Sequence, residues 1–198
     1  MPKMVFFIGA AGAGKTTAAM ALVRRRPAAF LDMDTLLRPA AEAIMKVAGL
    51  DPDDRDSPAY KELCRDLGYR ITMNAAAENV RLGMDAYLIG PFTQETADPD
   101  WLERELAALG EAAAGVEVKV VYVYLENEEK YRERIQSREL ATDEWKLRHW
   151  EQFSRSLARR DVRWNLPEGS VLRFDNSGEW NEEKTNVLER FVYGESKI

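Results

Sequence analysis

The sequence predicts an α/β fold in which a parallel sheet is doubly wound, with helices on both of its faces. Five short apolar segments of strand character alternate along the chain with segments of helical pattern. The first of these strands runs directly into a glycine-rich stretch and then a helix, the arrangement in which many α/β proteins bind ligands. Because 45% of the 198 residues are hydrophobic and 31% are charged, we expect residues 1–198 to form one globular domain.

Each element follows from a local pattern. Proline and glycine mark several of the boundaries: Pro27 follows the first helix, and Gly83 follows the third, which also contains Gly68 as a possible break. The expected strands cover residues 4–8, 28–31, 86–90, 116–125 and 170–174. The expected helices cover residues 18–25, 35–47, 59–81, 99–114, 128–135, 143–162 and 180–191.

The stretch after the first strand carries the most specific motif of the chain. Residues 9–16 satisfy G-x-x-x-x-G-K-[ST], a loop whose backbone N–H groups surround phosphate oxygens at the start of a helix. Lys15 is expected to reach the β- and γ-phosphates, and the hydroxyl of Thr16 is expected to bind Mg²⁺. A chance match in a glycine-rich turn is the alternative, and the flanking strand and helix disfavour it. The predicted nucleotide-binding residues are Gly9, Ala10, Ala11, Gly12, Ala13, Gly14, Lys15, Thr16 and Thr17.

Two carboxylates follow the second strand. Asp32 and Asp34 lie at its carboxyl end, where open α/β sheets bind their ligands. Either one could accept a proton from a substrate hydroxyl or hold a metal-bound water. Alternatively, Asp34 caps the helix that follows, since Asp is a favoured cap residue, whereas no capping role is expected for Asp32.

Composition excludes several classes of protein. The net charge of −6 argues against nonspecific nucleic-acid binding, and no apolar run reaches the length of a membrane span. The single cysteine, Cys64, excludes an internal disulfide, and the single histidine, His149, excludes a multi-histidine metal site. Since the first strand begins almost at the N-terminus, we expect no signal peptide and a cytoplasmic protein.

The phosphate-binding loop and the Leu31-Asp32-Met33-Asp34 segment together resemble the small-molecule P-loop kinases, such as shikimate kinase, gluconate kinase, chloramphenicol phosphotransferase and the zeta-toxin kinases. This resemblance implies a three-layer fold with a five-stranded sheet in the order 2-3-1-4-5. It also implies acceptor-binding helices within about residues 35–83 and a helical lid at about residues 137–150. ATP and Mg²⁺ would be the cofactors, and the partner would be a small molecule with a hydroxyl group.

Arginines after the fourth strand fit the same resemblance. Arg134 and Arg138 share one helix face and are similar to the R-x-x-x-R lid signature of these kinases. By that likeness Arg134 lies near adenine or the α- and β-phosphates, and Arg138 reaches the transferred phosphate. The alternative is a solvated face paired with glutamates, and Arg132, which points elsewhere, fits that alternative best. The loop that contains Asn176 would lie near adenine.

Substrate and metal contacts have weaker signals. The acceptor-binding candidates are Asp34, Arg38, Arg65, Arg70 and Phe92, and an arginine among them would suit an anionic acceptor or a sugar. Charges on an amphipathic helix are the alternative. The third strand has no carboxylate at its carboxyl end, because Asp85 lies at its start, so Mg²⁺ is held either by Asp32 or mainly by Thr16 and the nucleotide.

These predictions together favour an ATP-dependent kinase that transfers phosphate to an alcohol. An ATP-binding regulatory or toxin-type P-loop protein and a plain NTPase are the two alternatives. The missing carboxylate on the third strand counts against an efficient hydrolase. The sequence is compatible with a monomer or a homodimer.

Overall fold

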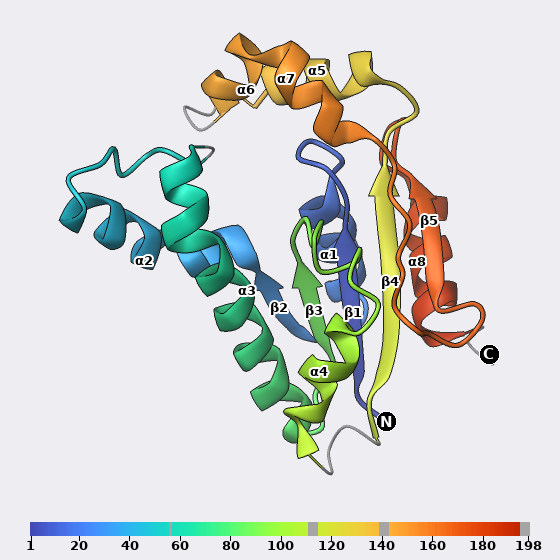
Figure 1. The fold of residues 1–198 in the computed structure, drawn as a ribbon. Coiled ribbons are helices and arrows are strands. Elements are labelled where there is room, and N and C mark those ends of the chain that lie inside the picture. The colour runs from blue at the N-terminus through green and yellow to red at the C-terminus, as the bar shows by residue number, and fades with distance from the viewer. Residues whose placement is uncertain (56, 111–114, 139–142, 195–198) are drawn as a thin grey trace.

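The computed structural model describes residues 1–55, 57–110, 115–138 and 143–194, and its centre is a five-stranded sheet (Figure 1). All neighbouring strands pair in parallel, in the order β2-β3-β1-β4-β5. This confirms the predicted α/β class and strand order. The strands are β1 (Lys3–Ile8), β2 (Ala29–Asp32), β3 (Ala86–Ile89), β4 (Glu117–Tyr124) and β5 (Val171–Asp175).

Helices connect the strands, as the alternating pattern predicts. Most of them begin and end within a few residues of the expected positions. In the described residues we find no helix with the length and hydropathy needed to span a bilayer. The helices are α1 (Lys15–Val23), α2 (Met33–Val47), α3 (Pro58–Arg81), α4 (Trp101–Ala107), α5 (Glu128–Gln136), α6 (Glu144–Arg148), α7 (Trp150–Ser154) and α8 (Glu182–Tyr193), with a 3₁₀ turn at Arg155–Leu157.

Both faces of the sheet are covered, so the molecule has three layers. The side chains of β1 alternate: Met4, Phe6 and Ile8 belong to a core formed with α3 and α4, whereas Val5 and Phe7 belong to a core formed with α1 and α8. All five are buried. A central strand that is apolar on both faces is what a sheet between two helical layers requires.

Helix α3 passes through Gly68 without a break. A Cβ atom at this position would lie 2.9 Å from the Leu37 side chain and 3.3 Å from that of Met33, both on α2. The glycine therefore allows α2 and α3 to approach closely and does not interrupt the helix. The possible break at Gly68 is thus not found.

The prediction of one helix over residues 143–162 is wrong. Two five-residue helices and the 3₁₀ turn end at Leu157, and the chain then returns along the face of the sheet that α3 and α4 cover (Figure 1). There the Arg163 N–H donates to the Thr96 carbonyl at 2.9 Å. The Trp164 ring is buried, stacks on Trp101 and contacts Phe6 edge to face. Burial of this large ring against the sheet favours the extended path after Leu157.

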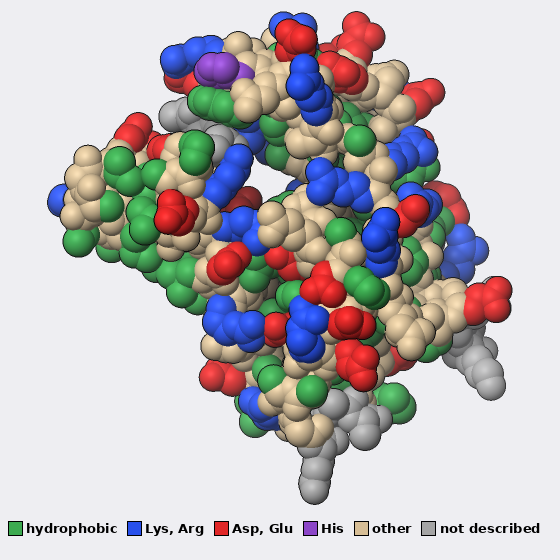
Figure 2. All heavy atoms as spheres, in the orientation of Figure 1, with side chains coloured by type: hydrophobic (Ala, Val, Ile, Leu, Met, Phe, Trp, Pro, Cys, Tyr) green, Lys and Arg blue, Asp and Glu red, His purple; other side chains and the backbone are tan. Residues whose placement is uncertain are grey.

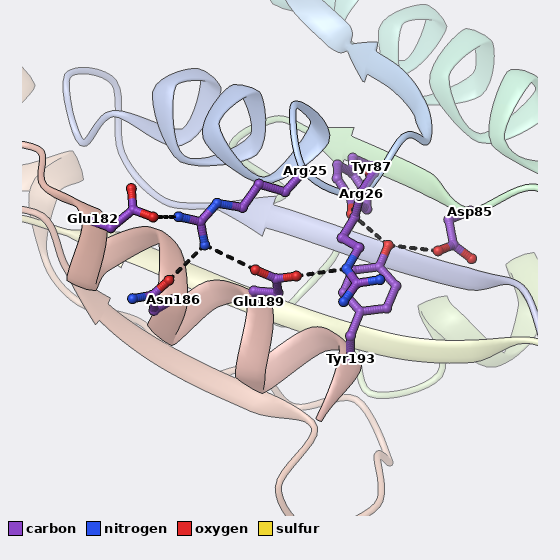
Figure 3. Close-up of polar contacts among 8 residues, drawn as sticks. All are labelled: Arg25, Arg26, Asp85, Tyr87, Glu182, Asn186, Glu189 and Tyr193. Atoms are coloured by element: carbon purple, nitrogen blue, oxygen red, sulfur yellow. Dashed lines mark hydrogen bonds and ion pairs between the residues drawn. The ribbon is translucent and has the colours of Figure 1, made fainter. Parts of the chain in front are cut away.

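A polar network holds α8 to the residues that follow α1 and to the amino end of β3 (Figure 3). Arg25 pairs with Glu182 and Glu189, and Arg26 also pairs with Glu189. Near the end of the helix, the Tyr193 hydroxyl donates to Asp85 at 2.7 Å, and the backbone N–H of Lys3 donates to the other Asp85 oxygen at 2.8 Å. Asp85 is thus a structural acceptor at the amino end of β3.

Candidate functional site

The candidate site lies where β1, β2 and β3 end. All of the strands are parallel, so their carboxyl ends share one edge of the sheet, and α5, α6 and α7 lie above this edge (Figure 1). Ligands of open α/β sheets bind at such an edge, next to the point where neighbouring connections run in opposite directions. In this sheet β1 lies between β3 and β4, which places the loop after β1 at that point.

Three glycines shape this loop. Gly9, Gly12 and Gly14 have φ angles of 137°, 87° and 92°, in the left-handed region that suits glycine best. A Cβ on Gly9 would lie 2.1 Å from the Val123 carbonyl oxygen, and one on Gly14 would lie 2.3 Å from the Asn176 amide nitrogen. Both the φ angle and the close packing therefore require glycine at these two positions.

Helix α1 begins without a capping side chain. Gly14 is its N-cap, no side chain among the described residues accepts a capping hydrogen bond from its backbone N–H groups, and its first turn contains no acidic residue. In contrast, Asp32, Ser57, Asn127 and Asn181 cap α2, α3, α5 and α8. The open N–H groups and the positive end of the α1 dipole together suit an anion such as phosphate.

Lys15 crosses back over the loop that precedes it. Its Nζ donates to the Ala10 carbonyl at 3.0 Å. Burial lowers the pKa of Lys15 to about 8; the charges of Asp34 and Asp32 oppose this lowering, and those of Arg138 and Lys146 add to it. Five charged side chains from α1, the β2–α2 junction and the α5–α6 region therefore interact electrostatically at the loop.

The helix cap after β2 is the other aspartate, not the one that the alternative reading named. Asp32, not Asp34, is the N-cap of α2, and its Oδ1 accepts from the Asp34 N–H at 3.1 Å. Its Oδ2 accepts from the Thr16 hydroxyl at 2.9 Å. Asp32 is still in an extended conformation, as an N-cap must be, which leaves Asp34 inside the first turn with an exposed side chain.

Thr16 and Asp32 form a donor set that fits Mg²⁺. A hydroxyl and a carboxylate are hard oxygen ligands, and Mg²⁺ commonly keeps waters and phosphate oxygens as its other ligands. In the described part of the chain, no group of three or more His, Cys, Asp or Glu residues could hold a metal by itself. The carboxyl end of β3 is apolar, and Asp85 is engaged at the far end of that strand.

Arg134 and Asn176 both contact the phosphate-binding loop. Asn176 is buried and its amide donates to the Ala13 carbonyl at 2.9 Å; Arg134 donates to the same carbonyl at 3.4 Å and to the Asn176 carbonyl. Burial, followed by the charge of Arg138, lowers the pKa of Arg134. Lys184, which the sequence analysis did not single out, donates to the Asn176 side chain at 3.3 Å and completes this group. Lys184 lies on α8, far along the chain from the loop, and only the packing of the fold brings the two together.

A second cationic group lies at the start of the predicted lid. Arg138 Nη1 lies 3.8 Å from Asp143 Oδ2, and Lys146 donates to Asp143 Oδ1 at 2.9 Å. Asp143 is 4% exposed, so this carboxylate holds both cations from a buried position. Lys146 is a further residue that the sequence analysis did not identify. Part of the predicted lid, residues 139–142, lies outside the described residues.

The predicted acceptor-binding residues are dispersed. Arg65 is paired with Glu95 at 2.6 Å, and exposed Arg70 forms two hydrogen bonds with Glu105, at 2.7 and 2.9 Å. Arg38 is exposed on α2. The prediction that Phe92 lines the acceptor pocket needs correction: this residue has a φ of 45° and no exposed surface. Its ring packs edge to face on Phe6, Tyr69 and Trp101, in the core beneath α3.

A hollow in the molecular surface separates the α2–α3 lobe from the helices above the sheet edge (Figure 2). Lysine and arginine side chains lie around its rim (Figure 2). Small-molecule sites of proteins are concave, so this hollow is a candidate entrance to the carboxyl edge of the sheet.

Comparisons with known proteins identify the same fold. A family model described as an AAA domain (AAA_33) matches residues 4–160. No curated protein matches the chain. A candidate kinase from Chloroflexus aurantiacus J-10-fl has 17% identity and a TM-score of 0.67 over 96% of both chains. A sugar kinase from Janibacter sp. HTCC2649 has 14% identity and a TM-score of 0.60, over 98% of this chain and 96% of that one. A gluconokinase from Sinorhizobium meliloti 1021 has 15% identity and a TM-score of 0.52, over 98% of this chain and 90% of the gluconokinase chain. At these identities the likeness concerns the fold, and it confirms the predicted resemblance to P-loop kinases at that level.

Proposed function

Because this chain belongs to the AAA domain family (AAA_33), whose model matches residues 4–160, we propose that it is an ATP-dependent phosphotransferase acting on a hydroxyl group of a small molecule. The observation that carries this proposal is the phosphate-binding loop at the uncapped start of α1, where Lys15 bonds the Ala10 carbonyl and Thr16 bonds Asp32. The charges of Asp34, Arg138, Asp32 and Lys146 act on this lysine. Phosphoryl transfer needs cations around the moving group and a carboxylate beside the attacking hydroxyl. This one cluster supplies both.

The nucleotide binds through its phosphates. The N–H groups of the loop and of the first turn of α1 donate hydrogen bonds to the phosphate oxygens, and Lys15 donates to the β- and γ-phosphates. Arg134 and Asn176 hold the loop in shape through the Ala13 carbonyl and lie beside the nucleotide. Thr16 and Asp32 would hold Mg²⁺, which would neutralise part of the phosphate charge.

The transfer step uses the carboxylate that remains exposed. The acceptor oxygen attacks the γ-phosphorus and forms a new P–O bond, and the bond from this phosphorus to the β–γ bridging oxygen breaks. The electron pair of that bond leaves with ADP, and the hydroxyl proton passes to Asp34. Asp34 is the better base because both oxygens of the Asp32 carboxylate already accept hydrogen bonds from the protein.

Cationic side chains of the lid balance the negative charge of the phosphoryl group as it is transferred. Arg138 and Lys146 leave Asp143 or share it as they turn toward the phosphoryl oxygens, where cations stabilise the transition state. Helix α6 then covers the site and excludes water, which favours transfer to the acceptor over hydrolysis.

An ADP-release assay tests this function. Purified protein with Mg·ATP is supplied in turn with pools of sugars, cyclitols, nucleosides and hydroxyl-bearing antibiotics, and ADP is followed by a coupled enzyme. We expect release that depends on one pool and is absent in Lys15→Met. Equal release without any acceptor would indicate an NTPase, and nucleotide binding without release under any condition would indicate a regulatory protein; either result would contradict the proposal.

A further inference from the structure

A polar groove lies between α3 and the segment that follows β3. Its volume is about 600 Å³, and its lining includes Arg65, Asp66, Tyr69, Gln94, Glu95 and Trp101. The segment starts at the nucleotide-binding edge, since the Gly90 N–H donates to the carbonyl of Phe7, two residues before the phosphate-binding loop. The groove therefore lies along the segment that leaves the nucleotide-binding edge, and it has the size of a small-molecule site.

Glu95 is the unusual residue of this groove. It is 6% exposed, and its Oε1 accepts from Arg65 at 2.6 Å. Its Oε2 is buried and forms no hydrogen bond of normal geometry among the described residues, although the Tyr69 hydroxyl lies near enough to interact with this carboxylate. The backbone here is fixed, because the Glu95 carbonyl accepts from the Trp164 indole at 2.7 Å. A buried carboxylate oxygen without a donor is costly, so this position favours a ligand that brings one.

Arg65 is the cation that an acidic acceptor would need, and it is already engaged. One of its terminal nitrogens donates to Glu95, and the other donates to Asp66 at 2.9 Å. Its guanidinium also lies over the Tyr69 ring, 4.8 Å from the ring centre. Two carboxylates therefore surround one arginine, and their combined charge exceeds its own.

The other charges of the groove are balanced by neighbours. Arg70 forms a bidentate pair with Glu105, and Asp98 pairs with Arg104 at 2.5 Å. The groove thus keeps the net negative charge of the Arg65, Asp66 and Glu95 group. An incoming carboxylate or phosphate would meet this charge without a free cation from these pairs.

We infer that the phosphoryl acceptor is a neutral polyhydroxyl compound or one with an ammonium group, held by a donor on Glu95 Oε2, and is not an acid. This rests on the proposed kinase function and names the substrate class. Glu95 is then a specificity-determining residue. The inference differs from the sequence-based expectation that an arginine of α3 would suit an anionic acceptor, because Glu95, 30 residues away in the chain, neutralises that arginine.

Matched hexoses test the inference. D-glucose, D-glucosamine and D-glucuronate share one ring and differ in charge, and each is included in a larger set of neutral, ammonium-bearing or carboxylate-bearing polyols. Binding is measured by calorimetry with a nonhydrolysable Mg·ATP analogue present, and turnover is measured by ADP release. We expect binding and turnover only in the neutral and ammonium sets. In Glu95→Gln the affinity of the best probe should fall at least tenfold, whereas exposed Glu103→Gln should change it less than twofold.

The outcomes separate the two proposals. Preferred binding of carboxylate probes, lost in Arg65→Gln, would overturn the inference but not the proposed kinase activity. The absence of binding in all three sets would also overturn the inference and leave the kinase proposal untouched. Binding of neutral or ammonium probes without any ADP release would contradict the kinase and support the ligand chemistry of the groove. If Glu95→Gln does not fold, the charge preference of the unmodified protein decides.

Discussion

The hydroxyl of Thr16 donates a 2.9 Å hydrogen bond to the carboxylate of Asp32. This bond joins the first turn of α1 to the end of β2, so the phosphate-binding loop and the start of α2 are fixed relative to each other. Because the other Asp32 oxygen caps α2, Asp32 has a structural role in addition to its proposed metal contact. Asp34, two residues later, has an exposed side chain and remains available for chemistry.

The two aspartates should therefore separate stability from turnover. Asp34→Ala removes the proposed base, and we expect kcat to fall about 10²- to 10⁴-fold, with a change in unfolding free energy below about 0.5 kcal/mol. Asp32→Ala removes a cap and should lower the unfolding free energy by about 1 kcal/mol. Urea unfolding and steady-state kinetics on both variants measure the split, and a normal kcat in Asp34→Ala would remove this residue from the mechanism.

Without a nucleotide, Lys15 should lower the unfolding free energy of the protein. Its pKa is about 8 in the folded chain, below the usual 10.5 of a lysine, because burial penalises its charged form. This penalty is fully present below pH 8. It disappears as the pH rises from about 8 toward 10.5, where the unfolded chain holds the extra proton. At pH 7 we expect Lys15→Met to raise the unfolding free energy by on the order of 1–3 kcal/mol. A variant less stable than the parent at pH 7, by thermal or urea unfolding, would contradict this.

The same pKa predicts proton uptake on nucleotide binding. The phosphates of ATP bring negative charge to Lys15 and raise its pKa, so at pH 8 the protein should take up a fraction of a proton as it binds. The binding enthalpy should then differ between phosphate and Tris buffers, whose ionisation enthalpies differ. At pH 6.5, where Lys15 is charged already, this contribution of Lys15 should vanish. Equal buffer dependence at both pH values would show that Lys15 does not titrate near 8.

Two arginines of the α5 region offer a matched pair. Arg138 lies near Asp143, and its charge acts on Lys15, whereas exposed Arg132 lies over the Trp150 ring, 5.6 Å from its centre. We expect Arg138→Ala to lower kcat about 10²-fold or more, the size typical of a cation that stabilises transferring phosphate. Arg132→Ala should stay within twofold of the parent protein. Equal effects of the two substitutions would indicate that both arginines belong to a solvated face.

Local patterns explain which parts of this protein can be predicted from its sequence. The phosphate-binding loop and the five strands depend on short-range chemistry: glycines at left-handed positions and apolar runs with turns at their ends. The aspartates show where such reasoning fails. Both Asp32 and Asp34 are good cap residues, and only the point at which the β2 backbone turns decides which of them is the cap.

Contacts across the chain could not be predicted. Lys146, Lys184 and Glu95 have no motif around them, and they reach the site because α6, α8 and the loop after β3 fold against it. The prediction of one helix over residues 143–162 was wrong for a related reason. Its aromatic spacing is compatible with a helix, but the chain beyond Leu157 is extended and buries Trp164 against Trp101 and Phe6.

Titration calorimetry with a nonhydrolysable Mg·ATP analogue tests the central claim, that the loop after β1 holds a nucleoside triphosphate. The account predicts one-to-one binding to the unmodified protein, and affinity at least tenfold weaker in Lys15→Met, which should remain folded. No heat of binding in the unmodified protein, or equal affinity in both, would contradict it.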